Sequence, residues 1–470
     1  MNCLNLSKVT HDVKCEMKKW QTRKLSPFGR ISILKTLIIP KFIHLFTTLT
    51  IPDKILSEIR TLLFKFIWSN KPDKVKRDIV CTNYMKGGLN MIEINDFVKS
   101  LKVNWMKRLF QSDCQWVELF IDLYGSLNRI CLGDLYYNNL IASISNPFWV
   151  DVFKNWQTVI KKQDYTCKSD ILNSCIWYNS KISKECLYYP TWFQRGIVLV
   201  GDIISSDGKI YDVATIEKIY NMKINLLEFF RVKLLVKKFI EKNAMIYRDP
   251  YNYIKPSIPC HVQILLKAKK GCQVFYKTFR HCVDPTAKIK WNNLVDMNQE
   301  EFWRAIYKIC FKSVQDNDLI WLQYMIIQNI LPTNYFLYKA NLKQDNSCQL
   351  CGNYPETILH LLSDCTKVKE LWKNLLYWIK IKTGIHLNLT QTMKVLGYTK
   401  LDTLFWPLNC IMIVVRKYIF SSSRKNPNLN IYFLQQQIQK TYFEQKLLAD
   451  INGFQPIFTK KWCQWQNLFQ

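Results

Sequence analysis

Four side chains of the kinds that bind zinc stand close together in the second half of this sequence. Cys348, Cys351, His360 and Cys365 follow the spacing C-x2-C-x8-H-x4-C. Structural Zn²⁺ sites are closed tetrahedra of thiolate and imidazole ligands, and three cysteines with one histidine supply such a set. The alternative is a chance grouping in a chain that holds 17 cysteines. The spacing favours a structural zinc site, which restricts how residues 345–380 can fold.

The same spacing predicts the local fold of this segment. Pro355-Glu356 should begin a short helix that presents His360. Five residues advance a helix by about 500°, so His360 and Cys365 cannot lie on one face of a continuous helix. Ser363-Asp364 is therefore expected to cap a second helix with Cys365 in its first turn, where the helix dipole stabilises a thiolate. That helix should have an apolar face at Val368, Leu371, Trp372, Leu375 and Ile379.

Positive charge is concentrated in two parts of the chain. The 66 Lys and Arg exceed the 36 Asp and Glu, which gives a formal net charge of +30. Residues 1–110 hold 21 basic and 8 acidic residues, and residues 231–290 hold 14 and 3. The excess indicates an anionic partner, either nucleic acid or an acidic membrane surface. The clustering favours a binding face over lysines that are solvated on every helix face.

The composition excludes several classes of protein. Its 470 residues are 49% hydrophobic, with only 13 Gly and 15 Pro, so the chain is neither disordered nor collagen-like. The start carries no signal-peptide pattern, and 17 cysteines then favour free thiols in a reducing compartment. No run approaches the roughly 18 apolar residues of a membrane span, and residues 411–415 are the longest candidate. We expect an intracellular protein of the nucleus and cytoplasm without a membrane partner. The basic run 71–77 fits either a nuclear signal or a solvated loop.

Helical patterns dominate the sequence. Ser26-Pro27 should cap and begin a helix that Pro40 bends or ends, and Asp53 should open another. Residues 196–212 predict a short β-hairpin with Ser206-Asp207-Gly208 as its turn. A further helix is expected over about 95–110 and carries the basic residues Lys99, Lys102, Lys107 and Arg108. We therefore predict a mainly α fold of several helical subdomains, with this hairpin and a small CCHC zinc-binding module.

Several separated segments share the pattern of one known family. They are WQTRKLSPFGRISILK at 20–35 with Pro40-Lys41, Phe66-Ile67-Trp68 with the basic run to Arg77, Gly87-Gly88-Leu89, Gly196-Ile197 with Asp202, Tyr220-Asn221 with Asn225, Leu331-Pro332-Thr333-Asn334, and the four-ligand set. Together they resemble the part of a non-LTR (LINE-type) retrotransposon reverse transcriptase that follows its palm. The resemblance covers most of the chain. The zinc segment is its most specific part, and the middle is weak.

The resemblance implies four regions and a set of partners. They are a thumb-like basic helical domain at 1–110, a mostly helical middle with the hairpin and a proline-containing linker at 111–300, a reverse-transcriptase zinc-binding domain at 301–400, and a helical tail at 401–470. In that family the thumb grips the template–primer duplex, and the zinc domain helps to hold template RNA and target DNA. Partners would be RNA, DNA and the rest of a retrotransposon polymerase. Phosphate contacts would come from Arg23, Lys24, Arg30, Lys35, Lys74, Lys76 and Arg77.

The sequence departs from that family where catalysis would require carboxylates. Reverse transcription uses carboxylates that hold two metal ions, with an adjacent Asp pair in the family, and no two Asp are adjacent here. No cluster of acidic residues and Lys resembling an endonuclease follows Cys365. We therefore expect a nucleic-acid-binding fragment of a reverse transcriptase that lacks the catalytic palm and is not an enzyme on its own.

Two alternatives remain open. The first is a zinc-scaffolded helical protein for protein–protein contact, with the Trp-rich middle as its hot spots. The second is an active enzyme, for which Asp202 and Asp212 are the carboxylates to test, although both read as turn residues. A further group at Cys260, His261, Cys272, His281 and Cys282 has irregular spacing, which favours ordinary packed or exposed side chains over a second metal site.

Overall fold

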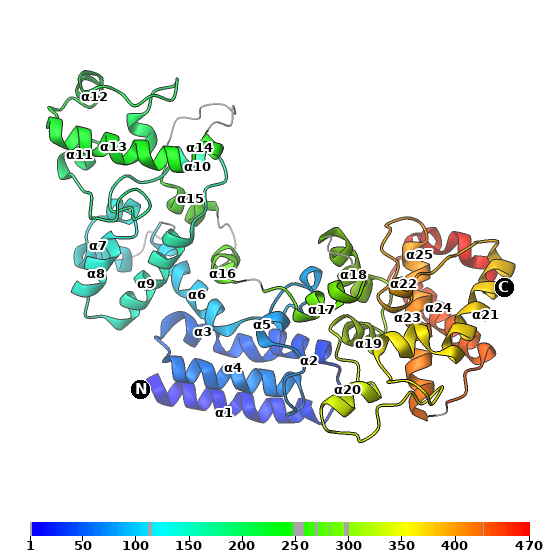
Figure 1. Ribbon diagram of the computed structural model, residues 1–470. Coiled ribbons are helices and arrows are strands. Elements are labelled where there is room, and N and C mark those ends of the chain that lie inside the picture. The colour runs from blue at the N-terminus through cyan, green and yellow to red at the C-terminus, as the bar shows by residue number, and fades with distance from the viewer. Residues whose placement is uncertain are drawn as a thin grey trace. The chain divides into compact units, whose positions relative to one another are not determined.

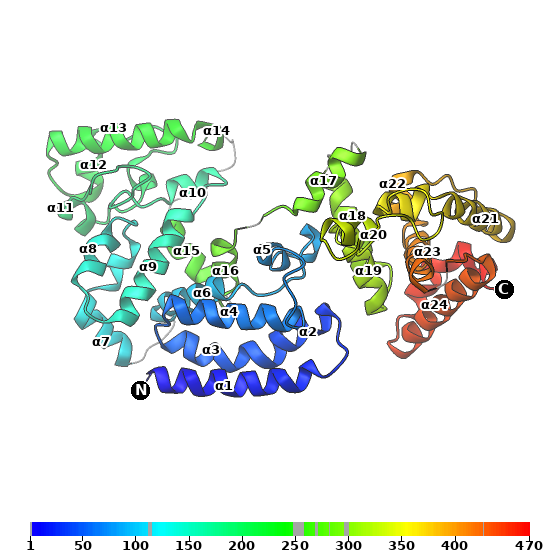
Figure 2. The ribbon, with the colours of Figure 1, turned by 60° about the horizontal axis from the view of Figure 1, so that its bottom comes forward.

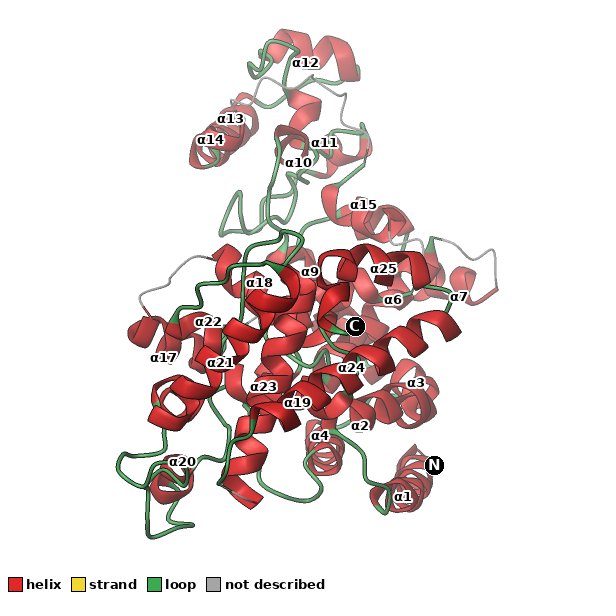
Figure 3. Cartoon of the chain, turned by 90° about the vertical axis from the view of Figure 1, so that its right-hand side faces the viewer, coloured by secondary structure: helices red, strands yellow, loops and turns green. Residues whose placement is uncertain are grey.

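A computed structural model describes residues 2–110, 115–247, 258–267, 271–281, 283–295, 300–425 and 427–470. Over these residues the backbone is mainly helical, and strand-like pairing is limited to isolated bridges (Figure 3). The predicted mainly α class is confirmed.

The helices are labelled in Figure 1. The first 110 residues form α1 (Asn2–Gln21), α2 (Pro27–Ile33), the π-helical turn η1 (Leu34–Ile38), α3 (Ile39–Thr48), α4 (Asp53–Ile67), α5 (Arg77–Val80), the 3-10 turn η2 (Tyr84–Lys86) and α6 (Ile94–Leu109). The middle forms α7 (Gln115–Tyr124), η3 (Leu127–Cys131), α8 (Tyr136–Ser143), α9 (Pro147–Lys162), α10 (Lys168–Leu172), α11 (Pro190–Gln194), η4 (Val200–Ile203), α12 (Val213–Tyr220), α13 (Leu226–Lys242), α14 (Ala244–Tyr247), α15 (Cys260–Lys267) and α16 (Gln273–Phe279). The remainder forms α17 (Thr286–Val295), α18 (Glu300–Lys312), α19 (Asn317–Ile327), α20 (Asn334–Lys339), the π-helical turn η5 (His360–Asp364), α21 (Thr366–Thr383), α22 (Gln391–Val395), α23 (Phe405–Lys425), α24 (Ile431–Ile451), α25 (Gln455–Trp462) and η6 (Cys463–Leu468).

The chain divides into two compact units that are each assembled from distant segments. Unit 1 comprises Met1–His11, Pro40–Arg60 and Glu93–His281, and unit 2 comprises Asp12–Ile39, Thr61–Ile92 and Cys282–Gln470. The zinc motif belongs to unit 2. The division of the sequence into four regions stays a prediction.

Unit 1 is built around two hydrophobic cores. In the first, α6 packs on α9 and α16, and buried side chains such as Met106, Phe120 and Trp156 meet there. The second surrounds Trp177 and Trp192 between α10 and α13. In the same unit α3 and the first half of α4 run side by side (Figures 1 and 2).

The predicted hairpin at 196–212 is reduced to a single bridge between Ile204 and Ile210. The turn lies where it was expected, and Gly208 takes the positive φ of 83° that it needs. The preceding residues form the 3-10 turn η4 because the Asp202 carboxylate accepts hydrogen bonds from the backbone N–H groups of Val198 and Leu199. These N–H groups are therefore not available to a β ladder.

Pro40 does not end the helix that Ser26 caps. The Ser26 hydroxyl accepts a hydrogen bond from Gly29 N, and Pro27 occupies the first turn, as predicted. A proline inside a helix lacks an N–H and crowds the carbonyl four residues earlier. The backbone widens to a π-helical turn at Leu34–Ile38 immediately before Pro40, and the helix continues to Thr48. A π-bulge is a common way to accommodate such an interruption.

One helical stretch, Pro27–Thr48, is long and apolar enough to cross a membrane, with a mean hydropathy of 1.3. This corrects the expectation that no stretch reaches that length. The finding rests on length and composition alone, and a core helix of a soluble protein meets the same criterion. The side chains of Ile38, Phe42 and Phe46 on this stretch are completely buried within the protein.

In unit 2 a glycine-centred contact joins the segment before residue 92 to α19. The Gly87 carbonyl accepts hydrogen bonds from Gln328 Nε2 at 2.7 Å and from the Tyr324 hydroxyl at 3.4 Å. Gly87 has φ +80°, and a Cβ there would lie 2.8 Å from the Tyr307 ring. At Gly88 a Cβ would lie 2.1 Å from the Thr82 carbonyl oxygen. The glycine pair is therefore required by both backbone conformation and space.

The C-terminal helices of unit 2 pack around a buried arginine. Helix α23 contacts α19 and α24, and Arg416 of α23 is completely buried. Its guanidinium donates to Gln323 Oε1 at 2.7 Å and to the carbonyl oxygens of Lys394 and Met393 at 2.8 and 2.9 Å. These bonds hold α19 and α22 against α23.

Lys102 of α6 is one of the basic residues of 1–110 that do not belong to a binding face. This side chain is completely buried, and its Nζ donates to the Leu49 carbonyl at 2.6 Å and lies 4.0 Å from Asp151. Burial lowers the pKa of Lys102 from 10.5 to about 8, and Asp151 opposes that shift. Lys107 is buried as well. These two lysines belong to the interior of unit 1 and not to a binding surface.

Lys102 should make the stability of the protein depend on pH. Its folded pKa of about 8 lies below the unfolded value, so the unfolded state binds more protons between about pH 8 and 10.5. The free energy of unfolding should therefore rise with pH across that window, by up to about 3 kcal/mol. Denaturant titrations should show this rise lost in Lys102→Met and retained in Lys99→Met, which alters an exposed lysine on the same helix. An equal rise in both variants would contradict the assignment.

Candidate metal centre

The four candidate ligands come together in unit 2. Their ligand atoms all lie within 4.8 Å of one another. Cys348 Sγ is 4.0 Å from Cys365 Sγ, and Cys351 Sγ is 3.3 Å from His360 Nε2. A tetrahedron with Zn–S bonds of ~2.3 Å and a Zn–N bond of ~2.0 Å has edges of ~3.5 to 3.8 Å. The arrangement therefore fits one structural Zn²⁺ ion with a closed set of ligands.

A tight turn presents the first two cysteines. Gly352 N donates to the Cys348 carbonyl at 2.7 Å, Cys348 N donates to the Tyr354 carbonyl at 2.8 Å, and Gly352 has φ +80°. A single antiparallel bridge between Ser347 and Pro355 closes the turn. This loop directs both sulfur atoms to the same point.

The two later ligands are placed differently from the prediction in detail. The short helix begins at Ile358 and not at Pro355-Glu356, and its last turn is the π-helical η5, which begins at His360. Cys365 is the N-cap residue of α21, so it precedes the first turn, and Ser363-Asp364 end η5. The two ligands still come from separate helices, as the five-residue spacing requires. The expected apolar face of α21 is buried.

Two of the ligands, Cys365 and His360, have a lowered pKa, whereas the hydrogen bond to Cys365 and burial raise the pKa of Cys348. The Cys348 thiol donates to the Cys365 sulfur and lowers the pKa of Cys365, and the backbone N–H groups of Val368 and Lys367 act in the same direction. Burial lowers the pKa of His360 and keeps its imidazole neutral. A thiolate and a neutral imidazole are the forms that bind Zn²⁺.

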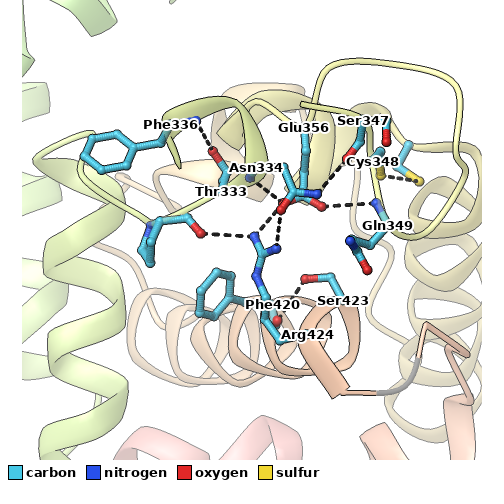
Figure 4. A network of polar contacts seen from close by, with 12 residues as sticks. Thr333, Asn334, Phe336, Ser347, Cys348, Gln349, Glu356, Phe420, Ser423 and Arg424 are labelled. Carbon is cyan, nitrogen blue, oxygen red and sulfur yellow. Dashed lines mark hydrogen bonds and ion pairs between the residues drawn. The ribbon is translucent and has the colours of Figure 1, made fainter. Parts of the chain in front are cut away.

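A buried carboxylate, Glu356, lies between Asn334 and the cysteine turn and is hydrogen-bonded to both (Figure 4). Glu356 has no exposed surface, and its oxygens accept hydrogen bonds from Asn334 N at 2.9 Å, from Gln349 N at 3.2 Å, and from the Arg424 guanidinium. The Asn334 side chain donates to the Ser347 carbonyl at 2.7 Å, directly before Cys348.

Arg424 completes this network from α23. It donates to the Asn334 side-chain oxygen at 2.6 Å and to the Pro332 carbonyl at 3.0 Å. Sequence reasoning missed Glu356 and Arg424 as site residues. The sequence signal is weak for Glu356, which lies between the ligands in the sequence, and for Asn334, which ends the Leu331–Asn334 motif. Nothing in the sequence pattern indicates Arg424, which lies 68 residues beyond Glu356.

Four of the seven predicted nucleic-acid contacts are exposed. Arg23, Lys24, Lys74 and Lys76 all lie on the surface of unit 2. The Arg23 guanidinium stacks 4.5 Å above the Trp20 ring. These cations are available to a ligand.

The other three are engaged within the protein. Arg30 is 6% exposed and donates to the carbonyl oxygens of Leu25 and Phe66. Arg77 pairs with Asp73 at 2.7 Å, and Lys35 Nζ donates to the Asn90 carbonyl at 3.2 Å. Arg30 in particular is a structural residue, because its guanidinium is buried and bonded to two backbone carbonyls.

The remaining candidate sites are ordinary structural residues. Burial lowers the pKa of His261 to about 4, and its Nε2 lies 3.2 Å from the Ile130 carbonyl. Cys260 donates to the Asp170 carbonyl at 2.8 Å, while Cys282 lies outside the described residues. Within the described ranges, the zinc motif is the one group of three or more His, Cys or acidic residues that could hold a metal.

The two carboxylates considered for catalysis cap backbone turns. Asp202 accepts the two N–H bonds before η4, and Asp212 accepts a hydrogen bond from Thr215 N at 2.8 Å at the start of α12. Both serve the turn roles that their sequence context indicates.

Comparisons with known proteins agree with this site. Residues 286–372, which include all four ligands, match a family described as zinc-binding in reverse transcriptase. The chain is also 27% identical over 390 residues to an Arabidopsis thaliana protein named "Putative ribonuclease H protein". That alignment covers 77% of this chain and 54% of the relative, so the chain spans about half the length of the curated relative it matches. The predicted structural zinc is confirmed by the ligand geometry and the family match together.

Removing one ligand should release the metal and unfold its surroundings. Ligand binding and local folding are coupled in structural zinc sites, so Cys351→Ser should lose about one equivalent of zinc and the order of residues 345–380. Metal analysis and hydrogen exchange measure both effects. Cys463→Ser, which alters an exposed cysteine of the same unit, should behave as the parent protein. A chelator that leaves helicity and stability unchanged would contradict the assignment.

The buried carboxylate should matter nearly as much as a ligand. Glu356→Gln removes the charge that Arg424 faces. Because the Arg424 side chain is 26% exposed, the cost should be smaller than the about 3 to 5 kcal/mol of breaking a fully buried pair. Zinc affinity should fall about 10- to 100-fold, because support residues orient the ligands. Competition with a chromogenic chelator measures that affinity. Glu185→Gln breaks an exposed pair with Arg231 and should have almost no effect, so equal losses would contradict the role of burial.

Proposed function

We propose that this chain binds RNA and DNA as the zinc-containing, non-catalytic region of a non-LTR retroelement reverse transcriptase. The similarity to reverse-transcriptase zinc-binding domains and to a ribonuclease H relative supports an association with nucleic acid. The observation that carries the proposal is a pair of basic loops in unit 2 that one buried arginine holds together.

Arg30 connects these two loops. Its Nε donates to the Leu25 carbonyl at 3.2 Å, and its Nη1 donates to the Phe66 carbonyl at 3.0 Å. Leu25 directly follows Arg23 and Lys24, and Phe66 lies at the end of α4, where the chain enters the loop of Lys71, Lys74 and Lys76. The buried guanidinium therefore brings the two exposed basic segments close together. We call Arg23, Lys24, Lys74 and Lys76 the basic surface.

Basic residues outnumber acidic ones in this loop, with Lys71, Lys74, Lys76 and Arg77 against Asp73 and Asp78. Burial lowers the pKa of Lys74, and repulsion from Lys71 lowers it further. Asp73 is occupied by its ion pair with Arg77. Phosphate groups would relieve this repulsion, and such contacts position a nucleic acid without reading its sequence.

Aromatic rings give this region a rigid base. Phe28, at the start of α2, lies edge-on to Trp321 with ring centroids 5.9 Å apart, and Trp68 lies 6.1 Å from the same ring. Lys74 Nζ is 5.9 Å from the Trp321 centroid. The cations therefore project from a packed platform, which reduces the conformational entropy lost on binding.

A second function has one observation in its favour. Helix α24 carries exposed apolar side chains at Phe443, Leu447 and Ile451, which are 52%, 60% and 71% exposed and spaced by four residues. Such a face is typical of a protein contact. It would serve the alternative of a zinc-scaffolded interaction protein, and it is compatible with nucleic-acid binding elsewhere on the unit.

Zinc-loaded protein should bind both RNA and duplex DNA with strong salt dependence. Each phosphate contact contributes about 0.9 to the slope of log K against log salt on duplex DNA. Neutralising the basic surface (Arg23, Lys24, Lys74 and Lys76 to Gln) should lower that slope by about 2 to 4 and weaken binding at least tenfold in fluorescence anisotropy.

A control of equal charge separates a local surface from general attraction. Lys373, Lys380, Lys382 and Lys400 are exposed in the same unit, and changing them to Gln removes the same formal charge. This control should bind nearly as the parent protein does. Undetectable binding of RNA and duplex DNA at about 50 mM salt would overturn the proposed function.

A further inference from the structure

A cavity of about 610 Å³ lies in unit 2 beside the zinc module. Helix α20 supplies Tyr335, Phe336 and Lys339, and α17 supplies Lys290. Its lining also includes the segment Thr357–Leu359, which directly precedes the ligand His360. Its volume falls within the ~300 to 1,000 Å³ of typical small-ligand sites.

The cavity is lined by aromatic rings and lysines, which suit a ligand that combines a flat ring with an anion. Phe336 is 40% exposed, and in Figure 4 its ring points away from the Glu356–Arg424 network. Lys339 Nζ lies 4.7 Å from the Tyr335 ring centroid, and Lys290 is exposed at the rim. Among the described residues that line the cavity, two are lysines and none is acidic. Apolar walls, aromatic faces and unopposed positive charge fit a nucleobase with its phosphates.

We propose that this cavity takes one unpaired nucleotide of a single-stranded RNA, with the base stacked on Phe336 and the flanking phosphates beside Lys290 and Lys339. The inference rests on the proposed function and assigns this site the unpaired part of the ligand. A base within a duplex is stacked between its neighbours and cannot enter. The cavity thus selects single strands, whereas the basic surface accepts either form.

Zinc should organise this cavity. The backbone N–H of His360 donates to the Thr357 hydroxyl at 3.1 Å, so a cavity residue is bonded to a metal ligand. At α20, the Thr333 hydroxyl caps the helix by accepting a hydrogen bond from Phe336 N. The Asn334 side chain donates to the carbonyl of Ser347, which directly precedes Cys348. Both walls are therefore connected to the zinc turn.

The test uses a 12-nucleotide uridine-rich RNA with one central 2-aminopurine and the zinc-loaded full chain. Stacking should quench the 2-aminopurine fluorescence. Phe336→Ala should abolish the quench and weaken RNA binding about 5- to 100-fold, the range for loss of one base–aromatic stack. It should leave the salt slope and the affinity for a blunt DNA duplex unchanged, because no charge is removed. Tyr377→Ala, which removes an aromatic ring that is 67% exposed on α21, is the matched control and should bind as the parent does.

Two further variants guard against a folding artefact. Phe336→Leu keeps apolar bulk without an aromatic face and should also lose the quench, whereas Phe336→Trp should retain it. Zinc content and thermal unfolding should match the parent in each. Lys290→Gln with Lys339→Gln should lower the salt slope for the single strand only.

The outcomes separate this inference from the proposed function. If Phe336→Ala and Tyr377→Ala bind RNA equally well, or if Phe336→Ala weakens duplex binding to the same degree, the cavity proposal is overturned and the basic surface stands. If adenosine monophosphate binds in the cavity and the 2-aminopurine fluorescence of the RNA is not quenched by the protein, the site takes free nucleotides. The proposal is then again overturned. If the parent protein binds neither RNA nor duplex DNA, the proposed function fails with it.

Discussion

The zinc module depends on a carboxylate that solvent does not reach. A buried charge is costly unless it is paired and hydrogen-bonded, and Glu356 meets both conditions through Arg424 and the backbone N–H groups of Asn334 and Gln349. The three donors come from α23, α20 and the cysteine turn. Satisfying one carboxylate therefore requires three distant segments to be in place together.

This requirement explains why the metal alone does not define the site. Four ligands fix the distances among four atoms, but they do not fix the orientation of the loop that carries the first two. The Asn334 side chain fixes that orientation by bonding the Ser347 carbonyl, and Arg424 holds Asn334 in turn. The metal ligands and the carboxylate network thus both support this turn, and each is expected to weaken when the other is lost.

The zinc ligands and several helices could be predicted from sequence because their signals are local. The spacing of Cys348, Cys351, His360 and Cys365 identified the ligands, and the Ser26-Pro27 cap identified the start of α2. Two backbone details could not be predicted from local sequence, because in each a neighbouring residue or turn offsets the local preference. Helix propensity predicts that the helix breaks at Pro40, but the π-helical turn before Pro40 lets it continue. Asp202 accepts backbone hydrogen bonds, so the expected hairpin strand forms a 3-10 turn instead. Arg424 is beyond local reasoning, since only the fold brings it to Glu356.

Counting charges from sequence also overstates the binding surface, because some cations stabilise the interior. Lys102 and Arg416 are completely buried, and Arg30 is almost so. Arg30 shows that such a residue can still serve binding indirectly, since its hydrogen bonds to the Leu25 and Phe66 carbonyls connect the segments that lead into two exposed basic loops. The segment that carries one of these loops is tied to α19 through the Gly87 carbonyl. Buried polar contacts therefore determine where the exposed charges stand, and the positions of those charges decide what an anionic ligand meets.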